Sequence, residues 1–133
     1  APNVALFRQG EQTNTAFIAR VPFDSGALTG SWSKDTYQNW SVDDKRHQMY
    51  QGERFTETLK RVEKLKGLAA EFGYGLADLA MGFCLADAAV STVACGMRNA
   101  NEVRLNTAYS DGQPLPPELL QQVREHQWQH KFY

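Results

Sequence analysis

Residues 90–106, with the sequence VSTVACGMRNANEVRLN, constrain the fold of this chain more than any other stretch. They open with a largely β-branched run, residues 90–93, which is typical of a strand in a sheet. Gly96 then lets the backbone turn, and Asn99 is a good N-cap for a helix that begins at Ala100. A strand that turns directly into a capped helix is typical of the βα unit of a parallel α/β sheet.

The turn between this strand and this helix has the features of an anion site. Backbone N–H groups at a helix N-terminus and the helix dipole both favour negative charge. Arg98 lies in the same turn and carries a guanidinium suited to phosphate oxygens. Glu102 stands three residues after the N-cap, at the capping-box position. These residues alone leave two interpretations open, a pocket for a nucleotide phosphate or an ordinary βα turn with a solvated arginine.

Length and composition limit what the chain can be. Its 133 residues are 42% hydrophobic, enough for one domain with one core. The net charge of −1 offers no basic face, so neither nucleic acid nor membrane is an expected partner. No apolar run reaches the roughly 18–20 residues of a membrane helix, and no signal peptide is expected. Cys84 and Cys95 have neither metal spacing nor a disulfide pattern, which favours a reducing, cytoplasmic location and no metal site.

A second strand is predicted in residues 16–23, AFIARVPF, a nearly continuous apolar run that suits a parallel strand covered on both faces. Residues 4–7 are a further short strand candidate, and only eight residues separate the two. A parallel crossover needs a dozen residues or more. The two segments therefore form a hairpin, or residues 4–7 lie outside the sheet, or a crossover helix present in an ancestor is missing.

The middle of the chain is predicted to hold a long loop and two helices. Residues 31–54 are polar with several aromatic side chains, and a loop of this length is usually functional or mobile. His47 within it is expected at the surface. From Phe55 the apolar residues recur every three or four positions, which predicts a helix that Gly73 ends. Leu76–Leu85 is apolar nearly all round and is expected to be a buried helix.

Two more helices, over residues 100–108 and 117–128, complete an α/β pattern, and Pro117 suits the first turn of the last one. The order strand–loop–helix–helix–strand–helix–helix predicts parallel strand pairing. Two or three strands cannot close a sheet on themselves, and open edges with apolar faces need a cover. The sequence therefore implies a partner: more chain, a second copy or another subunit.

Three segments occur in a familiar order: IARVPFDSGALTG, then DDKRHQMYQGERF with the helix after it, then GLADLAMGFCLADAAVSTVACGMRNANEVRLN. Together they resemble the C-terminal part of an aldo/keto reductase. The resemblance implies an α/β fold of the (β/α)8 TIM barrel type, for which about 250 residues is typical. Residues 1–133 would be a single partial domain, incomplete on its own. Residues 18–23 would be strand seven, Val90–Ala94 strand eight and residues 115–128 the closing helix.

The resemblance also implies a binding site for NADP(H). In the family, the loop after strand seven lies along the cofactor pyrophosphate, and the turn after strand eight holds the adenosine end with its 2′-phosphate. Arg98 is the residue expected at that phosphate. The cofactor-binding residues carried over are Pro22, Phe23, Asp24, Ser25, Gly26, Leu28, Gly30, Gly96, Arg98, Glu102 and Asn106.

The chain departs from the family pattern in several places. The family usually has proline where Cys95 stands and glutamine where Glu102 stands, and a carboxylate near a phosphate would repel it. The catalytic Tyr, Asp, Lys and His of the family lie in the first half of the barrel, and nothing here corresponds to them. The helix expected between strands six and seven is also predicted to be absent, given the eight-residue linker.

Two functions follow as expectations. The first is a partial NADP(H)-dependent aldo/keto reductase that carries cofactor-binding loops, has no catalytic residues and requires the missing N-terminal half-barrel. The alternative is a non-catalytic, truncated binding or assembly module that self-associates to cover its sheet edges. A hydrolase using Ser25 or Cys95 lacks a base at credible spacing.

Overall fold

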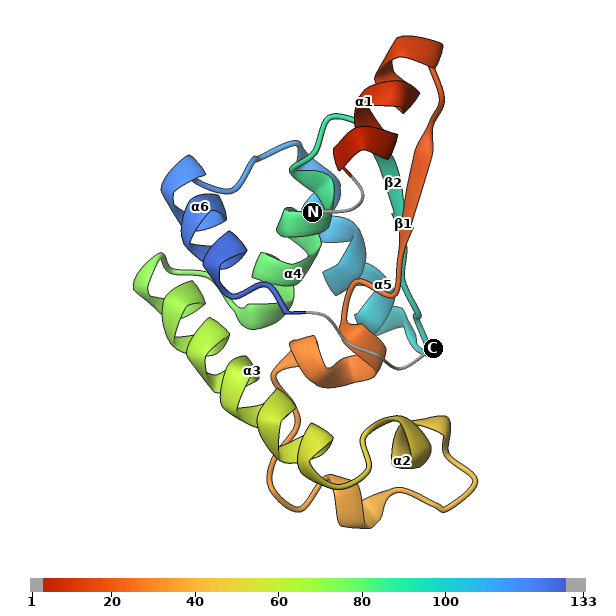
Figure 1. Cartoon of the computed structure of the whole chain (residues 1–133), viewed down its shortest axis with the longest axis vertical. Helices are drawn as coiled ribbons and strands as arrows, with labels where there is room; N and C mark the ends of the chain where they lie inside the picture. Colours follow the sequence, from red (N-terminus) through yellow and green to blue (C-terminus); the bar gives the residue numbers. More distant parts are fainter. Residues whose placement is uncertain (1–3, 129–133) are drawn as a thin grey trace.

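The computed structural model describes residues 4–128, which form a short parallel sheet with helices packed beside it (Figure 1). Helices are labelled α, strands β and 3-10 helices η. In chain order the elements are α1 (Val4–Thr13), β1 (Phe17–Arg20), η1 (Asp24–Thr29), η2 (Tyr37–Asn39), α2 (Lys45–Met49), α3 (Glu53–Glu71), α4 (Leu76–Leu85), β2 (Val90–Ala94), α5 (Ala100–Thr107), η3 (Ala108–Asp111) and α6 (Pro117–Glu125).

The two strands pair in parallel, as the sequence predicts. Phe17 of β1 is opposite Val90 of β2, and Arg20 is opposite Ala94, with one irregularity in the register after Phe17. The crossover between the strands runs through α3 and α4, and α4 packs against β2. Parallel pairing places the carboxyl ends of β1 and β2 at the same edge of the sheet. Whatever follows the two strands therefore lies at that common edge.

Strand β1 is shorter than predicted. The expected strand over residues 16–23 ends at Arg20, because Val21 adopts a φ of 58° that no strand residue has. The side chain of Ile18 is 66% exposed, so the sheet face that the apolar run was expected to bury is bare. Among the described residues the sheet has only two strands, and one of its faces is exposed. It is therefore an open sheet, as the number of predicted strands indicates.

The N-terminal prediction is wrong. Residues 4–7 are not a strand but the first turn of α1, which continues to Thr13. Most residues of this stretch are good helix formers, and the strand interpretation considered only its four apolar residues. Phe7 packs edge-to-face on Phe17 at a ring distance of 5.1 Å, so α1 folds back on β1. The predicted absence of a helix before β1 is therefore wrong as well.

The segment predicted as a long loop, residues 31–54, folds onto an aromatic cluster. Trp32 packs edge-to-face on Trp40 at 4.8 Å and on Tyr50 at 4.9 Å. Tyr37 stacks on His47 at 4.8 Å and donates its hydroxyl hydrogen bond to the His47 carbonyl oxygen over 3.1 Å. His47 is thus half-buried and not the surface residue that was predicted. The cluster ties residues 31–52 to the start of α3.

The main core lies where α3 packs against α4 and α6 (Figure 1). Its largest fully buried side chains are Tyr50, Val62 and Leu119. The predicted apolar stripe of α3 faces this core, with Phe55, Val62 and Ala69 buried. Helix α4 has the predicted bounds but is not buried all round, because Phe83 is 41% exposed on its other side.

Asp78 joins the first turn of α4 to η3. Its Oδ2 atom accepts a hydrogen bond from the Gly75 backbone N–H over 2.8 Å, which caps the helix. Its Oδ1 atom accepts a hydrogen bond from the Tyr109 hydroxyl. Burial, and then the hydrogen bond to Asp78, raise the pKa of Tyr109 above its ordinary value. The chain after α5 is therefore attached to the same helix that covers β2.

Gly82 of α4 is expected to tolerate no side chain. A Cβ atom there would lie 2.7 Å from Leu115 Cγ, and Leu115 is buried. Alanine normally favours a helix interior over glycine by about 0.5–1 kcal/mol, but overpacking costs about 1–3 kcal/mol. We expect Gly82→Ala to lower the free energy of unfolding by about 1–2 kcal/mol in urea denaturation.

Gly67 of α3 is the matched control, because a Cβ atom there would meet nothing within 4 Å. Gly67→Ala should raise the free energy of unfolding by about 0.5–1 kcal/mol. If both variants shifted the unfolding midpoint in the same direction, the packing of Leu115 against Gly82 would be contradicted.

Among residues 4–128, no single helix is long and apolar enough to cross a membrane; α3 and α4 meet the length and composition test only as a pair, and an 85° bend separates them.

Candidate functional site

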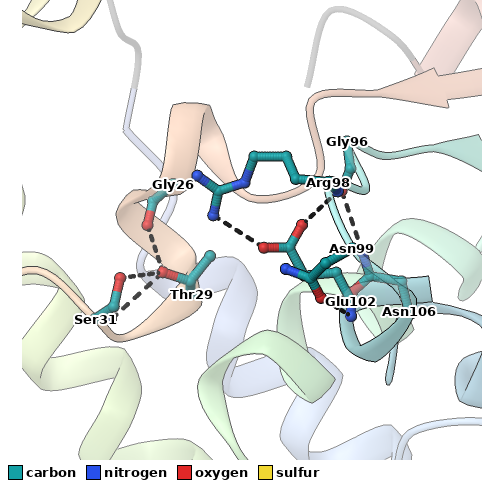
Figure 2. A network of polar contacts seen from close by, with 8 residues as sticks. All are labelled: Gly26, Thr29, Ser31, Gly96, Arg98, Asn99, Glu102 and Asn106. Atoms are coloured by element: carbon teal, nitrogen blue, oxygen red, sulfur yellow. Dashed lines mark hydrogen bonds and ion pairs between the residues drawn. The ribbon is translucent and has the colours of Figure 1, made fainter. Parts of the chain in front are cut away.

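Two βα corners meet at the carboxyl edge of the sheet. The first is the segment from Val21 through η1, after β1, and the second is the turn from Cys95 to Asn99, after β2. The parallel pairing of β1 with β2 places both corners on the same side of the sheet. In Figure 2 the Arg98 side chain extends from the second corner in the direction of η1, whose Gly26 and Thr29 are labelled. The two corners therefore lie next to each other at this edge of the sheet.

The first corner has an unusual backbone. Val21, Asp24 and Ser25 have φ angles of 58°, 45° and 57°, a left-handed region that residues other than glycine seldom adopt. Gly26 follows with a φ of 108°. Conformations of this kind cost about 1–3 kcal/mol each and cluster at functional sites. Such strain persists only where the surrounding structure holds the backbone in place.

The side chain of Tyr50 supports the first corner through a hydrogen bond to its backbone. This side chain is fully buried, and its hydroxyl donates a hydrogen bond to the Asp24 carbonyl oxygen over 2.9 Å. Thr29 adds a hydrogen bond from its Oγ1 atom to the Gly26 carbonyl oxygen at 2.8 Å, shown in Figure 2. The sequence alone does not predict this role of Tyr50. The density of aromatic residues between Trp32 and Phe55 was the available sign that this segment supports a structure.

The second corner forms the predicted helix cap. Asn99 Oδ1 accepts a hydrogen bond from the Glu102 backbone N–H over 2.9 Å, as an N-cap residue does. Asn106 donates from its Nδ2 atom to the Gly96 carbonyl oxygen over 3.3 Å, which closes the turn against α5 (Figure 2). Helix α5 thus begins at Ala100, as predicted.

The carboxylate of Glu102 does not complete an ordinary capping box. Instead of the Asn99 backbone N–H, its Oε2 atom accepts the Arg98 backbone N–H over 2.7 Å. Its Oε1 atom accepts from Arg98 Nη2 over 2.9 Å. The side chain of Arg98 is 86% exposed and that of Glu102 is 27% exposed. The guanidinium is therefore held by the carboxylate on one side while most of its surface is open to solvent.

Arg98 also sets the charge of Glu102. The side-chain hydrogen bond from Arg98, and then the one from its backbone, lower the pKa of Glu102 below its ordinary value. The carboxylate is charged at neutral pH, so the corner presents an arginine and a glutamate side by side. Any anion that binds Arg98 must share it with Glu102.

The groups at the second corner otherwise suit an anion. The N–H groups of Ala100 and Asn101 lie in the first turn of α5, where no intrahelical acceptor is within reach. A Cβ atom added to Gly96 would meet nothing within 4 Å, so the turn is open there. A guanidinium beside a helix N-terminus is the donor set that phosphate oxygens prefer. The residues of the second corner fit the phosphate groups of a nucleotide cofactor, and the carboxylate of Glu102 opposes an anion there.

The predicted site residues lie at the two corners, except Glu102 and Asn106, which lie in α5 beside the second corner. Pro22 is buried, and Leu28 packs against the hydrophobic core, so their side chains support the first corner. The remaining residues after β1 are Phe23, Asp24, Ser25, Gly26 and Gly30, and those after β2 are Gly96, Arg98, Glu102 and Asn106. In the part of the chain that the structure describes, no three His, Cys, Asp or Glu side chains come together as a metal site would require.

Comparison with known proteins relates this chain to one family. A sequence model of the aldo/keto reductase family matches residues 2–127. A probable voltage-gated potassium channel subunit beta of Oryza sativa subsp. japonica is 29% identical over 106 residues, which cover 77% of this chain and 32% of that protein. The structure of a glycerol dehydrogenase from Gluconobacter oxydans has the same fold, with a TM-score of 0.78 at 22% identity, over 96% of this chain and 38% of that one. The chain thus spans about a third of the length of these relatives.

Proposed function

The chain belongs to the aldo/keto reductase family, and from this premise we propose that it is the C-terminal portion of an NADP(H)-dependent carbonyl reductase. On this proposal β1 and β2 are strands seven and eight of a (β/α)8 barrel, and residues 1–133 are a single partial domain. The observation that carries the proposal is the position of the two βα corners, which share one sheet edge with Arg98 at the second. Phosphate sites of barrel enzymes often lie in the loops after these two strands.

Each corner has a distinct part in holding the cofactor. Arg98 would bind the 2′-phosphate through its exposed guanidinium, next to the first turn of α5. The strained backbone from Asp24 to Gly26 would follow the pyrophosphate, kept in shape by Tyr50. When bound, the nicotinamide supplies the hydride that reduces a carbonyl. The chain's own contribution is to bind and orient that group.

The chain is not proposed to perform acid–base chemistry. Tyr50 is fully buried and its hydroxyl is committed to Asp24, while the Tyr37 hydroxyl is committed to the His47 carbonyl oxygen. A general acid must reach the substrate oxygen, which neither hydroxyl is placed to do. We therefore expect no NADPH oxidation by this chain alone.

The remaining barrel is the proposed partner. β1 and β2 pair only with each other among the described strands, and Ile18 and Val21 are 66% and 40% exposed beside the sheet. A closed barrel pairs both edges of every strand. The N-terminal half-barrel, in the same polypeptide or in another, would cover these surfaces. Both cysteines are free thiols, which fits a reducing cytoplasm as the location.

The same exposed strands favour a second candidate function, a non-catalytic assembly module. Two copies of the chain could cover each other's strand edges, because unpaired edges readily pair with further strands. Such a module would form a stable oligomer, which a measurement of mass in solution detects. In such a module the substitution Arg98→Ala would leave the affinity for NADPH unchanged.

Nicotinamide fluorescence tests the proposed function directly. Titrating NADPH against the chain should give a saturable change that weakens as salt is raised, since a charged phosphate contact is screened by salt. Adding the N-terminal half of an aldo/keto reductase barrel should strengthen this binding and restore NADPH oxidation by an aldehyde. If NADPH bound neither the chain alone nor its mixture with the N-terminal half, the proposed function would be wrong.

A further inference from the structure

The ion pair between Glu102 and Arg98 bears on which nucleotide this site prefers. The carboxylate accepts hydrogen bonds from both the backbone N–H and Nη2 of Arg98, at 2.7 and 2.9 Å. A carboxylate and a phosphate use a guanidinium in the same way, through its parallel N–H groups. Glu102 therefore occupies part of the same group that a 2′-phosphate needs.

Arg98 contacts both oxygens of this carboxylate. Its backbone N–H donates to one oxygen and its guanidinium donates to the other (Figure 2). The Asn99 side chain, by capping the Glu102 N–H, keeps the residue at the third position of α5. A phosphate that reached Arg98 would consequently lie close to a fixed negative charge.

The two forms of the adenosine ribose respond to that charge in opposite ways. A 2′-phosphate is mostly a dianion at neutral pH, so the negatively charged carboxylate repels it. A 2′-hydroxyl can donate a hydrogen bond to a carboxylate, which is the contact that acidic residues make with the ribose of NAD. The same residue thus opposes one nucleotide and accommodates the other.

We propose that Glu102 is a specificity-determining residue that competes with the 2′-phosphate for Arg98, so that this corner discriminates only weakly between NADP(H) and NAD(H). The inference rests on the proposed cofactor site. Arg98 attracts the 2′-phosphate and Glu102 repels it. The balance of these two interactions sets the preference for NADP(H) over NAD(H).

The substitution Glu102→Gln tests this role. Glutamine keeps an oxygen that can accept the Arg98 backbone N–H but removes the charge. In parallel fluorescence titrations of the chain, the Kd for NADPH is expected to fall about threefold to tenfold, while the Kd for NADH stays equal or rises. Adenosine 2′,5′-bisphosphate and AMP serve as second probes, because they carry only the adenosine end and should show the same split.

Glu118→Gln is the matched control. Glu118 is an exposed glutamate in the first turn of α6, so its substitution removes one negative charge from the first turn of another helix, away from the corner. It should leave the ratio of the NADPH and NADH Kd values unchanged. Circular dichroism of both variants should match that of the original chain.

The outcomes separate the two proposals. If both nucleotides bind and Glu102→Gln leaves the ratio of their Kd values unchanged, the specificity role is overturned and the proposed function stands. If neither NADPH nor adenosine 2′,5′-bisphosphate binds the original chain or Glu102→Gln, with or without the N-terminal half, both proposals are overturned. A selective gain in NADPH affinity supports both.

Discussion

Replacing Tyr50 with alanine is expected to lower the free energy of unfolding by about 3–5 kcal/mol, the largest stability effect anticipated for a single substitution here. The ring is fully buried against Trp32 and Trp40, so its removal leaves a cavity in the aromatic cluster. It also leaves the Asp24 carbonyl oxygen without the hydrogen bond that the Tyr50 hydroxyl donates. Urea denaturation followed by tryptophan fluorescence measures the change.

Tyr50→Phe separates the two contributions. Phenylalanine keeps the ring and loses only the hydroxyl, so it should lower the free energy of unfolding by about 1–2 kcal/mol. Because that hydroxyl contacts the first corner, Tyr50→Phe is also expected to weaken NADPH binding while the chain remains folded. Equal losses of stability in Tyr50→Ala and Tyr50→Phe would contradict the buried position of the ring.

Replacing Arg98 with alanine is expected to weaken NADPH binding about tenfold to a hundredfold, which is the scale of a charge-assisted hydrogen bond to phosphate. NADH binding should change much less, because NADH lacks the 2′-phosphate. The stability of the chain should hardly change, since the Arg98 side chain is 86% exposed and exposed ion pairs contribute little. Nicotinamide fluorescence and urea denaturation check the two expectations separately.

Arg104→Ala provides the control for charge. Arg104 lies in the last turn of α5 and donates from Nη2 to Asn101 Oδ1 at 2.5 Å, on the same helix. Removing its charge should leave NADPH affinity within about twofold of the original, because exposed charges beyond the contact are screened by salt. An equal loss in Arg98→Ala and Arg104→Ala would mean that net charge, and not a phosphate contact, governs binding.

The sequence predicts those elements whose signals are local. Strand β2, helix α4 and the start of α5 lie where the β-branched run, the apolar run and the Asn99 cap place them. In each case the residues that define the element also set its ends. The parallel pairing follows from the same pattern of strands and helices.

The errors occur where distant residues decide the structure. Helix α1 packs through Phe7 and Gly10 on Phe17, a contact that four apolar residues read alone do not reveal. After β1 the backbone has positive φ angles, and its Asp24 carbonyl oxygen accepts a hydrogen bond from Tyr50, 26 positions later in the chain. The periodicity of apolar residues predicts which side of a helix or strand is buried, but it does not predict which distant residue packs there.

The proposed site residues can be located from the sequence, but their contacts cannot. Resemblance to a family placed the expected residues at the two corners, and parallel strands bring those corners together. The orientation of the Glu102 carboxylate was not foreseen, because a capping-box pattern predicts a bond to the Asn99 N–H. The structure directs it instead to both donors of Arg98.

The parallel pairing has a consequence for how the chain folds. Phe17 and Val90 are partners although 73 positions separate them (90 minus 17). Closing so long a loop is entropically costly, and contacts of high sequence separation slow folding. During synthesis β1 leaves the ribosome long before its partner exists, while α3 and α4 can already pack on each other. We therefore expect the pairing of β1 with β2 to form later than the contacts between α3 and α4.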